Sequence, residues 1–207
     1  MMMAKRIRLS NEVGKGKGEE KEEEVKTLEI TIVPLTWIIA PLVTKEQLKR
    51  WHDKKWIDDD GLHLDRAFPR DCEGNAILFR FWLESPMVKV ARTFKDPEKY
   101  HKVAREWEII DEHGFPVNYV KIGKPLRYRR VILAENKRTT EFFEYIDGTY
   151  YLTFKVRTKW PKEFVELLAS AGRIGIMART KHGYGKFYVI VGRPKEVKEE
   201  KEEESKQ

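Results

Sequence analysis

Cysteine occurs once in the 207 residues, at Cys72, which excludes a disulfide framework and a zinc site built from several cysteines. No run approaches the roughly 20 apolar residues of a membrane-spanning helix, because Pro34, Thr36 and Pro41 interrupt the most apolar stretch. The first residues lack the apolar core of a signal peptide. We therefore expect a cytoplasmic protein with no membrane partner, in which Cys72 is a small packing residue.

Glutamine is almost absent, occurring only at Gln47 and Gln207, whereas 41 residues are Lys or Arg and 34 are Asp or Glu. Such Lys/Glu-rich and Gln-poor usage is typical of hyperthermophile proteins. The formal net charge of +7 favours a polyanionic partner. It is equally compatible with a basic soluble protein that binds no polyanion.

Both ends of the chain are poor in apolar residues. Residues 1–26 are basic, then Gly/Lys-rich, then acidic, and we expect a disordered arm there. Residues 195–207 form a charged Lys/Glu tail. We expect the part between them, residues 27–194, to be a single α+β domain with an insertion at about residues 86–138.

The hydrophobic pattern predicts strands and one helix before residue 138. A capping box of Thr44 and Gln47 should open a helix over residues 45–56. Pro86 should separate two strands. The strands are expected over residues 28–33, 75–83, 87–93, 103–110, 117–122 and 127–134.

The dipeptide Asp147-Gly148 is typical of a type I′ turn, which predicts a hairpin between strands 139–146 and 149–157. A second helix should begin at Pro161, and Gly172 should follow its end as the C′ residue. Its predicted apolar face contains Phe164, Leu167, Leu168 and Ala171. Residues 186–191 alternate as a last strand.

In order, these elements indicate an α+β fold of the ferredoxin-like (split βαβ) type. It would have an antiparallel sheet, two helices and an inserted set of β-hairpins. The alternative is a general α+β domain with an antiparallel sheet.

Residues 172–187 are rich in glycine and basic residues, and no acidic residue occurs from Leu167 to Lys195. Glycines let another backbone approach closely, cations and hydroxyls bind phosphates, and aromatic rings stack on unpaired bases. The alternative is a tight β-hairpin whose glycines only permit turns. The candidate nucleic-acid-binding residues of this segment are Arg173, Arg179, Thr180, Lys181, His182, Gly183, Tyr184, Gly185 and Lys186.

The segment Arg-Thr-Lys-His-Gly-Tyr-Gly-Lys-Phe, residues 179–187, resembles the C-terminal signature of the RAMP superfamily. These are ferredoxin-like, or RRM-like, RNA-binding proteins of CRISPR systems. They include repeat-processing endoribonucleases and backbone subunits of effector complexes. The resemblance covers about a sixth of the chain. It implies that the glycine-rich loop lies between the second helix and the last strand and contacts RNA.

Two further groups of residues have weaker patterns. Arg127, Arg129 and Arg130 form either a second phosphate track or a solvated sheet face. His52 lies among lysines on the first helix, where it either acts as a general acid or base in RNA cleavage or simply flanks Trp51. The first arrangement resembles that of the RAMP endoribonucleases, which have a histidine on or near the first helix.

We predict no metal site and no cofactor. The five histidines are scattered, and no His-Glu-x-x-His pattern occurs. The acidic run at residues 58–60 lacks the spaced ligands of a calcium loop and is interpreted as a solvated helix end.

The leading hypothesis is an RNA-binding subunit of a CRISPR-type or mobile-element ribonucleoprotein. Its partners would be RNA, single-stranded by preference, or another nucleic acid, and other protein subunits. One alternative is a metal-independent endoribonuclease that uses His52. Another is a DNA-binding or structural protein of an archaeal virus or plasmid.

Overall fold

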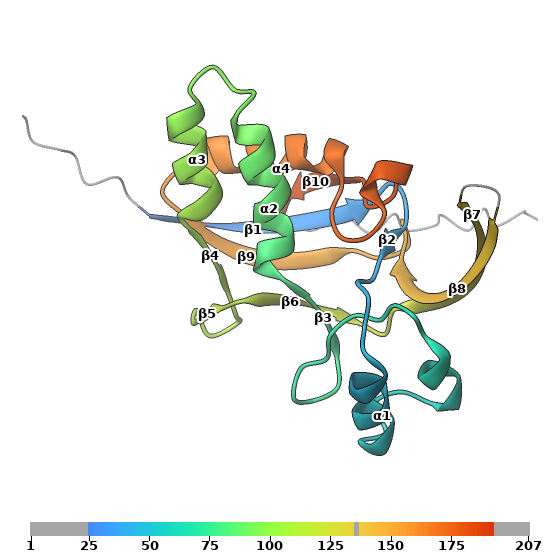
Figure 1. Ribbon diagram of the computed structural model, residues 1–207. Helices are drawn as coiled ribbons and strands as arrows, with labels where there is room; N and C mark the ends of the chain where they lie inside the picture. Colours follow the sequence, from blue (N-terminus) through green and yellow to red (C-terminus); the bar gives the residue numbers. More distant parts are fainter. Residues whose placement is uncertain (1–24, 135–136, 193–207) are drawn as a thin grey trace, which may run out of the picture.

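The computed structural model describes residues 25–134 and 137–192. The expected arm lies outside this range except for its last two residues, and the expected tail lies outside it altogether. The described residues form a mixed α+β fold (Figure 1). Its main sheet is antiparallel and has the order β10 (Phe187–Val191), β1 (Lys26–Pro34), β9 (Leu152–Thr158), β4 (Trp107–Ile110) and β5 (Pro116–Val117).

The described residues also form two smaller sheets. One has the order β2 (Ile38–Ile39), β8 (Lys137–Ile146) and β7 (Leu126–Ala134). The other pairs β3 (Ala76–Phe79) with β6 (Tyr119–Gly123). In Figure 1 the β7–β8 ribbon curves away from the rest of the molecule.

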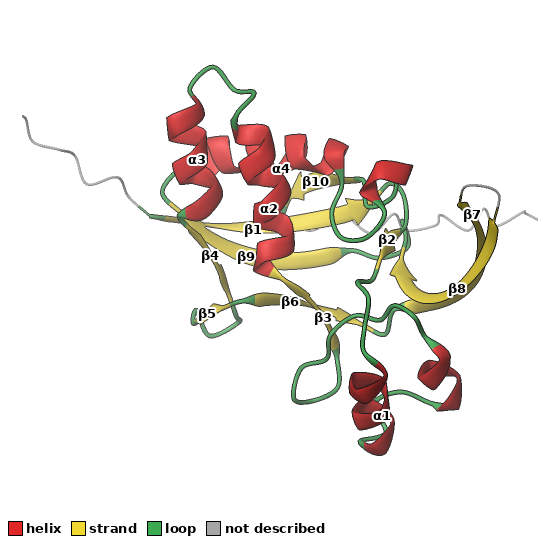
Figure 2. Ribbon diagram, viewed as in Figure 1, coloured by secondary structure: helices red, strands yellow, loops and turns green. Residues whose placement is uncertain are grey.

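Four α-helices occur among the described residues, where the sequence predicted two. They are α1 (Lys45–Asp53), α2 (Arg80–Ala91), α3 (Pro97–Arg105) and α4 (Pro161–Ile174). Figure 2 shows α2, α3 and α4 together above the main sheet, and α1 on the other side. None of these helices is long and apolar enough to cross a membrane.

The main core lies between the sheet and its helices. Ile30 of β1 pairs in register with Phe154 of β9, so both side chains point to one face, and the β-branched residues suit a strand. On α4 the four predicted apolar residues, Phe164, Leu167, Leu168 and Ala171, are all fully buried. The amphipathic pattern of α4 and the strand at β1 are therefore confirmed.

A second, smaller core surrounds α1. It contains Leu48, Trp51, Ile57, Leu64 and Ala67. The predicted capping box is present, since the Gln47 N–H donates to the Thr44 hydroxyl at 3.2 Å and the Thr44 N–H donates to the Gln47 side chain at 3.0 Å.

The strand predicted over residues 87–93 is wrong, because these residues belong mostly to α2. Pro86 lies inside this helix and is buried, where it removes one intrahelical hydrogen bond but fills the core. Leu83, Met87 and Val90 follow the helical spacing and share the buried face. Residues 86–138, the expected insertion, contain half of α2, all of α3 and strands β4 and β5 of the main sheet.

The predicted Asp147-Gly148 hairpin is also wrong. The flanking strands β8 and β9 belong to different sheets, and Gly148 does not take the positive φ of a type I′ turn. Instead, the Asp147 carboxylate accepts hydrogen bonds from the backbone N–H and the hydroxyl of Thr149. This local bonding turns the chain from one sheet to the next.

Gly172 lies inside α4 and is not its C′ residue. A β-carbon at Gly172 would lie 2.3 Å from the Phe187 carbonyl oxygen, so glycine is required for the close approach of α4 to β10. The helix ends at Ile174, and Gly175 caps it with a positive φ of 94°.

Candidate nucleic-acid interface

The glycine-rich loop connects α4 to β10, as predicted, and is anchored by its backbone. The Ile176 N–H donates to the Gly185 carbonyl at 3.0 Å, which closes the loop on itself. The Gly185 N–H donates to the Trp37 carbonyl at 2.8 Å, and the Ala178 N–H donates to the Ile39 carbonyl at 3.2 Å. The loop is therefore held against the segment that follows β1. The tight β-hairpin considered as an alternative is not formed, because Thr180–His182 make a short 3₁₀ turn.

Gly183 and Gly185 both take a positive φ, but their surroundings differ. A β-carbon at Gly185 would lie 2.1 Å from the Ile176 carbonyl oxygen. A β-carbon at Gly183 would meet nothing within 4 Å. Gly185 is therefore needed for backbone packing, whereas Gly183 is needed only for its backbone conformation.

Arg179 does not present an unpaired charge. Its guanidinium forms a bidentate ion pair with the Glu141 carboxylate on β8, with 3.2 Å between Nε and Oε2. Glu141 also accepts from Nε of Arg66 at 3.4 Å. The side chains of Arg179 and Glu141 are only 21% and 13% exposed. Two arginines thus share one carboxylate, which leaves the group with one net positive charge.

Other predicted residues of the loop are open to solvent. Lys181 and His182 are adjacent in the 3₁₀ turn, and both are exposed. Arg173 and Lys186 are also exposed, whereas Thr180 is half-buried. The loop therefore offers exposed cations, whereas the Glu141 carboxylate neutralises Arg179.

Tyr184 belongs to an aromatic group that sequence reasoning missed. Its ring stacks on Trp37, with 6.2 Å between centroids and 17° between planes. Trp37 also packs on Tyr145 of β8 at 4.8 Å. All three residues are half-buried. A hollow of about 260 Å³ next to them is lined by Leu35, Thr36, Trp37, Asp147, Gly148 and Tyr184. Nothing in the local sequence around Trp37 indicated this contact.

The other predicted residues belong to other elements. Arg127, Arg129 and Arg130 are in strand β7, and their side chains lie outside the part of the structure that is described. His52 is on α1, which Figure 1 places on the other side of the main sheet from α4. Its Nε2 lies 2.9 Å from an Asp59 carboxylate oxygen. The His52 side chain lines a cleft of about 1080 Å³, which is also lined by Trp56.

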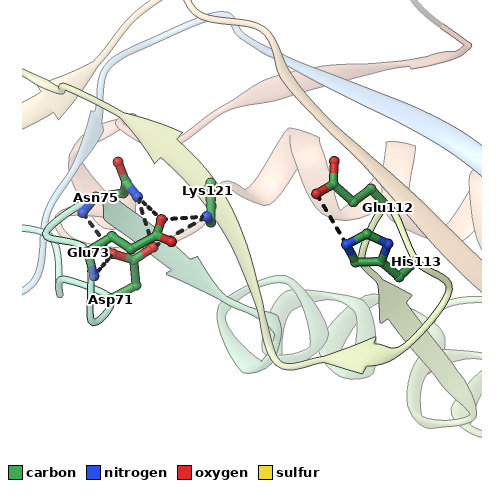
Figure 3. Close-up of polar contacts among 6 residues, drawn as sticks. All are labelled: Asp71, Glu73, Asn75, Glu112, His113 and Lys121. Atoms are coloured by element: carbon green, nitrogen blue, oxygen red, sulfur yellow. Dashed lines mark hydrogen bonds and ion pairs between the residues drawn. The ribbon is translucent and has the colours of Figure 1, made fainter.

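Asp71 organises a turn (Figure 3), and Glu73, Gly74 and Asn75 of this turn line the cleft. Burial alone would raise the Asp71 pKa, but the pKa lies below its ordinary value. Hydrogen bonds from the Asn75 side chain and the N–H groups of Asn75 and Glu73, together with the Lys121 charge, outweigh burial. Lys121 joins β6 to the turn through an ion pair with Glu73 at 3.0 Å.

The second contact in Figure 3, between His113 and Glu112, is an exposed pair at 3.5 Å. Within residues 25–134 and 137–192, no three His, Cys, Asp or Glu side chains are grouped so that they could hold a metal ion.

Comparisons with known proteins give a similarity in fold alone. No family model matches the sequence, and no curated protein matches it. Among solved structures, the chain is similar to one in the cryo-EM structure of the type III-B Cmr-β complex bound to cognate target RNA, with a TM-score of 0.51 and 10% sequence identity. The match covers 81% of this chain and 60% of that chain, so this chain spans less than two thirds of its structural neighbour.

Proposed function

We propose that this protein binds RNA, single-stranded by preference, through the glycine-rich loop, as a RAMP-like subunit of a CRISPR-type or mobile-element ribonucleoprotein. The observation that supports this best is the exposed turn of Lys181 and His182 on a backbone-anchored loop beside the Trp37–Tyr184 stack. Cations bind phosphates and aromatic faces stack on unpaired bases, which is the combination used for single strands.

The order of the elements supports a ferredoxin-like core. In chain order, β1, the α2–α3 pair, β4, β9, α4 and β10 alternate as β-α-β-β-α-β. We propose one domain over residues 27–194 with two inserted segments, residues 35–79 and 111–151, in place of a single insertion at about residues 86–138. The resemblance of residues 179–187 to RAMP proteins and the fold shared with a Cmr-β chain favour the same family.

A matched pair of tyrosine variants tests the proposal. Tyr184 is next to the basic turn, whereas Tyr188 is an exposed tyrosine on β10. Tyr184→Ala should lower affinity for a labelled single-stranded RNA by about 1–3 kcal/mol through lost stacking, and Tyr188→Ala should not. Melting temperatures of both variants separate lost binding from lost folding. Equal affinities of the two folded variants would contradict the proposal, as would a wild-type protein that binds no RNA.

The same labelled substrates separate the alternatives. Preference for duplex DNA over single strands would favour the DNA-binding alternative. The His52–Asp59 hydrogen bond at the large cleft favours the second candidate, metal-independent cleavage, because a carboxylate can orient an imidazole. That candidate requires cleavage in EDTA by the wild type and none by His52→Ala. It fails if the wild type leaves every RNA intact.

A further inference from the structure

A groove of about 330 Å³ lies between α2 and the first half of the glycine-rich loop. This volume is at the lower end of the range for small-molecule sites, about 300–1,000 Å³. Its residues come from the segments before and after α1, from α2, and from the end of α4 with the loop. They are Pro41, Leu42, Arg66, Trp82, Ser85, Pro86, Lys89, Ile174, Gly175, Ile176, Met177, Ala178 and Thr180.

The charged residues that line this groove are both cations, Arg66 and Lys89. Ser85 and Thr180 add two hydroxyl groups. Lys89 is exposed on α2, and Arg66 is held at the groove by its bond to Glu141 at 3.4 Å. The lining has the exposed Lys89 ammonium, two hydroxyls and the Arg66 guanidinium, which Glu141 partly neutralises, so the groove is suited to an anion such as a phosphate.

The rest of the lining is mostly apolar. Trp82 is half-buried and packs on Phe79 and Phe81 with centroids 5.3 Å and 4.9 Å away. Met177 takes a positive φ of 67°, which is uncommon for a residue with a β-carbon. Ile174 remains 42% exposed at the end of α4. An aromatic and apolar wall beside a cationic rim can accept a flat base joined to a phosphate.

We propose that this groove holds one unstacked nucleotide of the bound single strand, with its base against Trp82 and its phosphate at Lys89 and Arg66. The inference rests on the proposed function, because it extends the loop interface onto α2. The groove and the loop share Thr180, so a strand that contacts Lys181 can continue into the groove.

Lys89 and Lys95 provide a matched test. Both lysines are exposed, Lys89 at the groove and Lys95 beyond the end of α2. Affinity for a fluorescent single-stranded RNA is measured over a salt series. Lys89→Ala should weaken binding about 3- to 10-fold and lower the slope of log affinity against log salt by about 0.7, and Lys95→Ala should change neither.

A cross-linking experiment tests whether a base of the bound RNA lies against Trp82. RNA with 5-iodouridine at successive positions is irradiated with the wild-type protein, and the attached peptide is identified by mass spectrometry. Attachment at Trp82 from one position is expected. Attachment only outside the groove would overturn the inference, and so would a Lys89→Ala protein that binds like Lys95→Ala.

These results remain distinct from failure of the proposed function. If Tyr184→Ala weakens binding while Lys89→Ala does not, the loop binds RNA and the groove does not. A wild-type protein that binds no RNA would overturn both proposals.

Discussion

Arg179 is paired with a carboxylate that is distant in the sequence, so the sequence around Arg179 does not indicate its pairing. Its neighbours in sequence are free of acidic residues, which indicated an unpaired cation. In the folded chain Glu141, 38 residues away, accepts two hydrogen bonds from its guanidinium. Arg66 binds the same carboxylate. The carboxylate fixes both arginines in place and competes with any phosphate that approaches them.

Glu141→Gln is therefore expected to increase affinity for RNA. Loss of the carboxylate charge releases two guanidinium groups for phosphates, and we expect binding about 3- to 10-fold tighter at low salt. Partly buried arginines that lose their partner should also lower the free energy of unfolding by about 1–3 kcal/mol. Fluorescence anisotropy and urea denaturation measure the two effects.

Glu163→Gln is the matched control, since it removes the same charge from an ion pair with Lys99 of α3. Glu163 lies in the first turn of α4, at the end away from the loop. If Glu141→Gln and Glu163→Gln bind RNA equally, Glu141 does not restrain Arg179 as described.

The two glycines of the loop allow a direct comparison. Gly185→Ala places a β-carbon against the Ile176 carbonyl at a positive φ, so it should lower the free energy of unfolding by more than about 3 kcal/mol. Gly183→Ala has space around it and should cost only about 1 kcal/mol through its backbone conformation. Thermal and urea unfolding compare them. Equal losses of stability in the two variants would be inconsistent with the loop geometry.

At the scale of elements, some parts of the fold could be predicted and others could not. Helix α4 was predictable because its apolar residues keep a strict helical spacing up to Ala171. Helix α2 was missed because Pro86 resembles a strand boundary, and tertiary burial of the proline outweighs its lost hydrogen bond. The hairpin at Gly148 was mistaken because local turn chemistry does not determine which sheet each flanking strand joins.

The turn held by Asp71 gives a prediction about how the free energy of unfolding depends on pH. Because the folded-state pKa of Asp71 is lowered, its stabilisation is present above the unfolded value near 3.8 and is lost as pH falls through the folded value. Asp71→Asn resembles the protonated side chain. The wild type should exceed this variant in unfolding free energy by about 1–2 kcal/mol at pH 7, with the difference shrinking as pH falls below 3.8.

Urea denaturation at a series of pH values measures this difference. A difference that stays constant as pH falls from 7 to well below 3.8 would show that the ionised carboxylate does not hold the turn.

At the scale of the whole molecule, the place of the candidate site was predictable but its composition was not. The position of the loop between a helix and the last strand followed from the sequence, because glycine and charge are local signals. Trp37, Glu141 and Lys89 come from other elements, and only the three-dimensional packing brings them to the loop or to the groove beside it. The net charge of +7 favours a polyanion but does not locate it.

The salt dependence of RNA binding tests the central claim most directly. Log affinity of the wild type for a single-stranded RNA should fall linearly with log salt between about 50 and 300 mM, by about 0.7 for each phosphate contact. Lys181→Ala should lower this slope by about 0.7, and Lys159→Ala, at the opposite end of α4, should leave it unchanged. An affinity that is flat across this range, or equal slopes for the two variants, would contradict RNA binding through the glycine-rich loop.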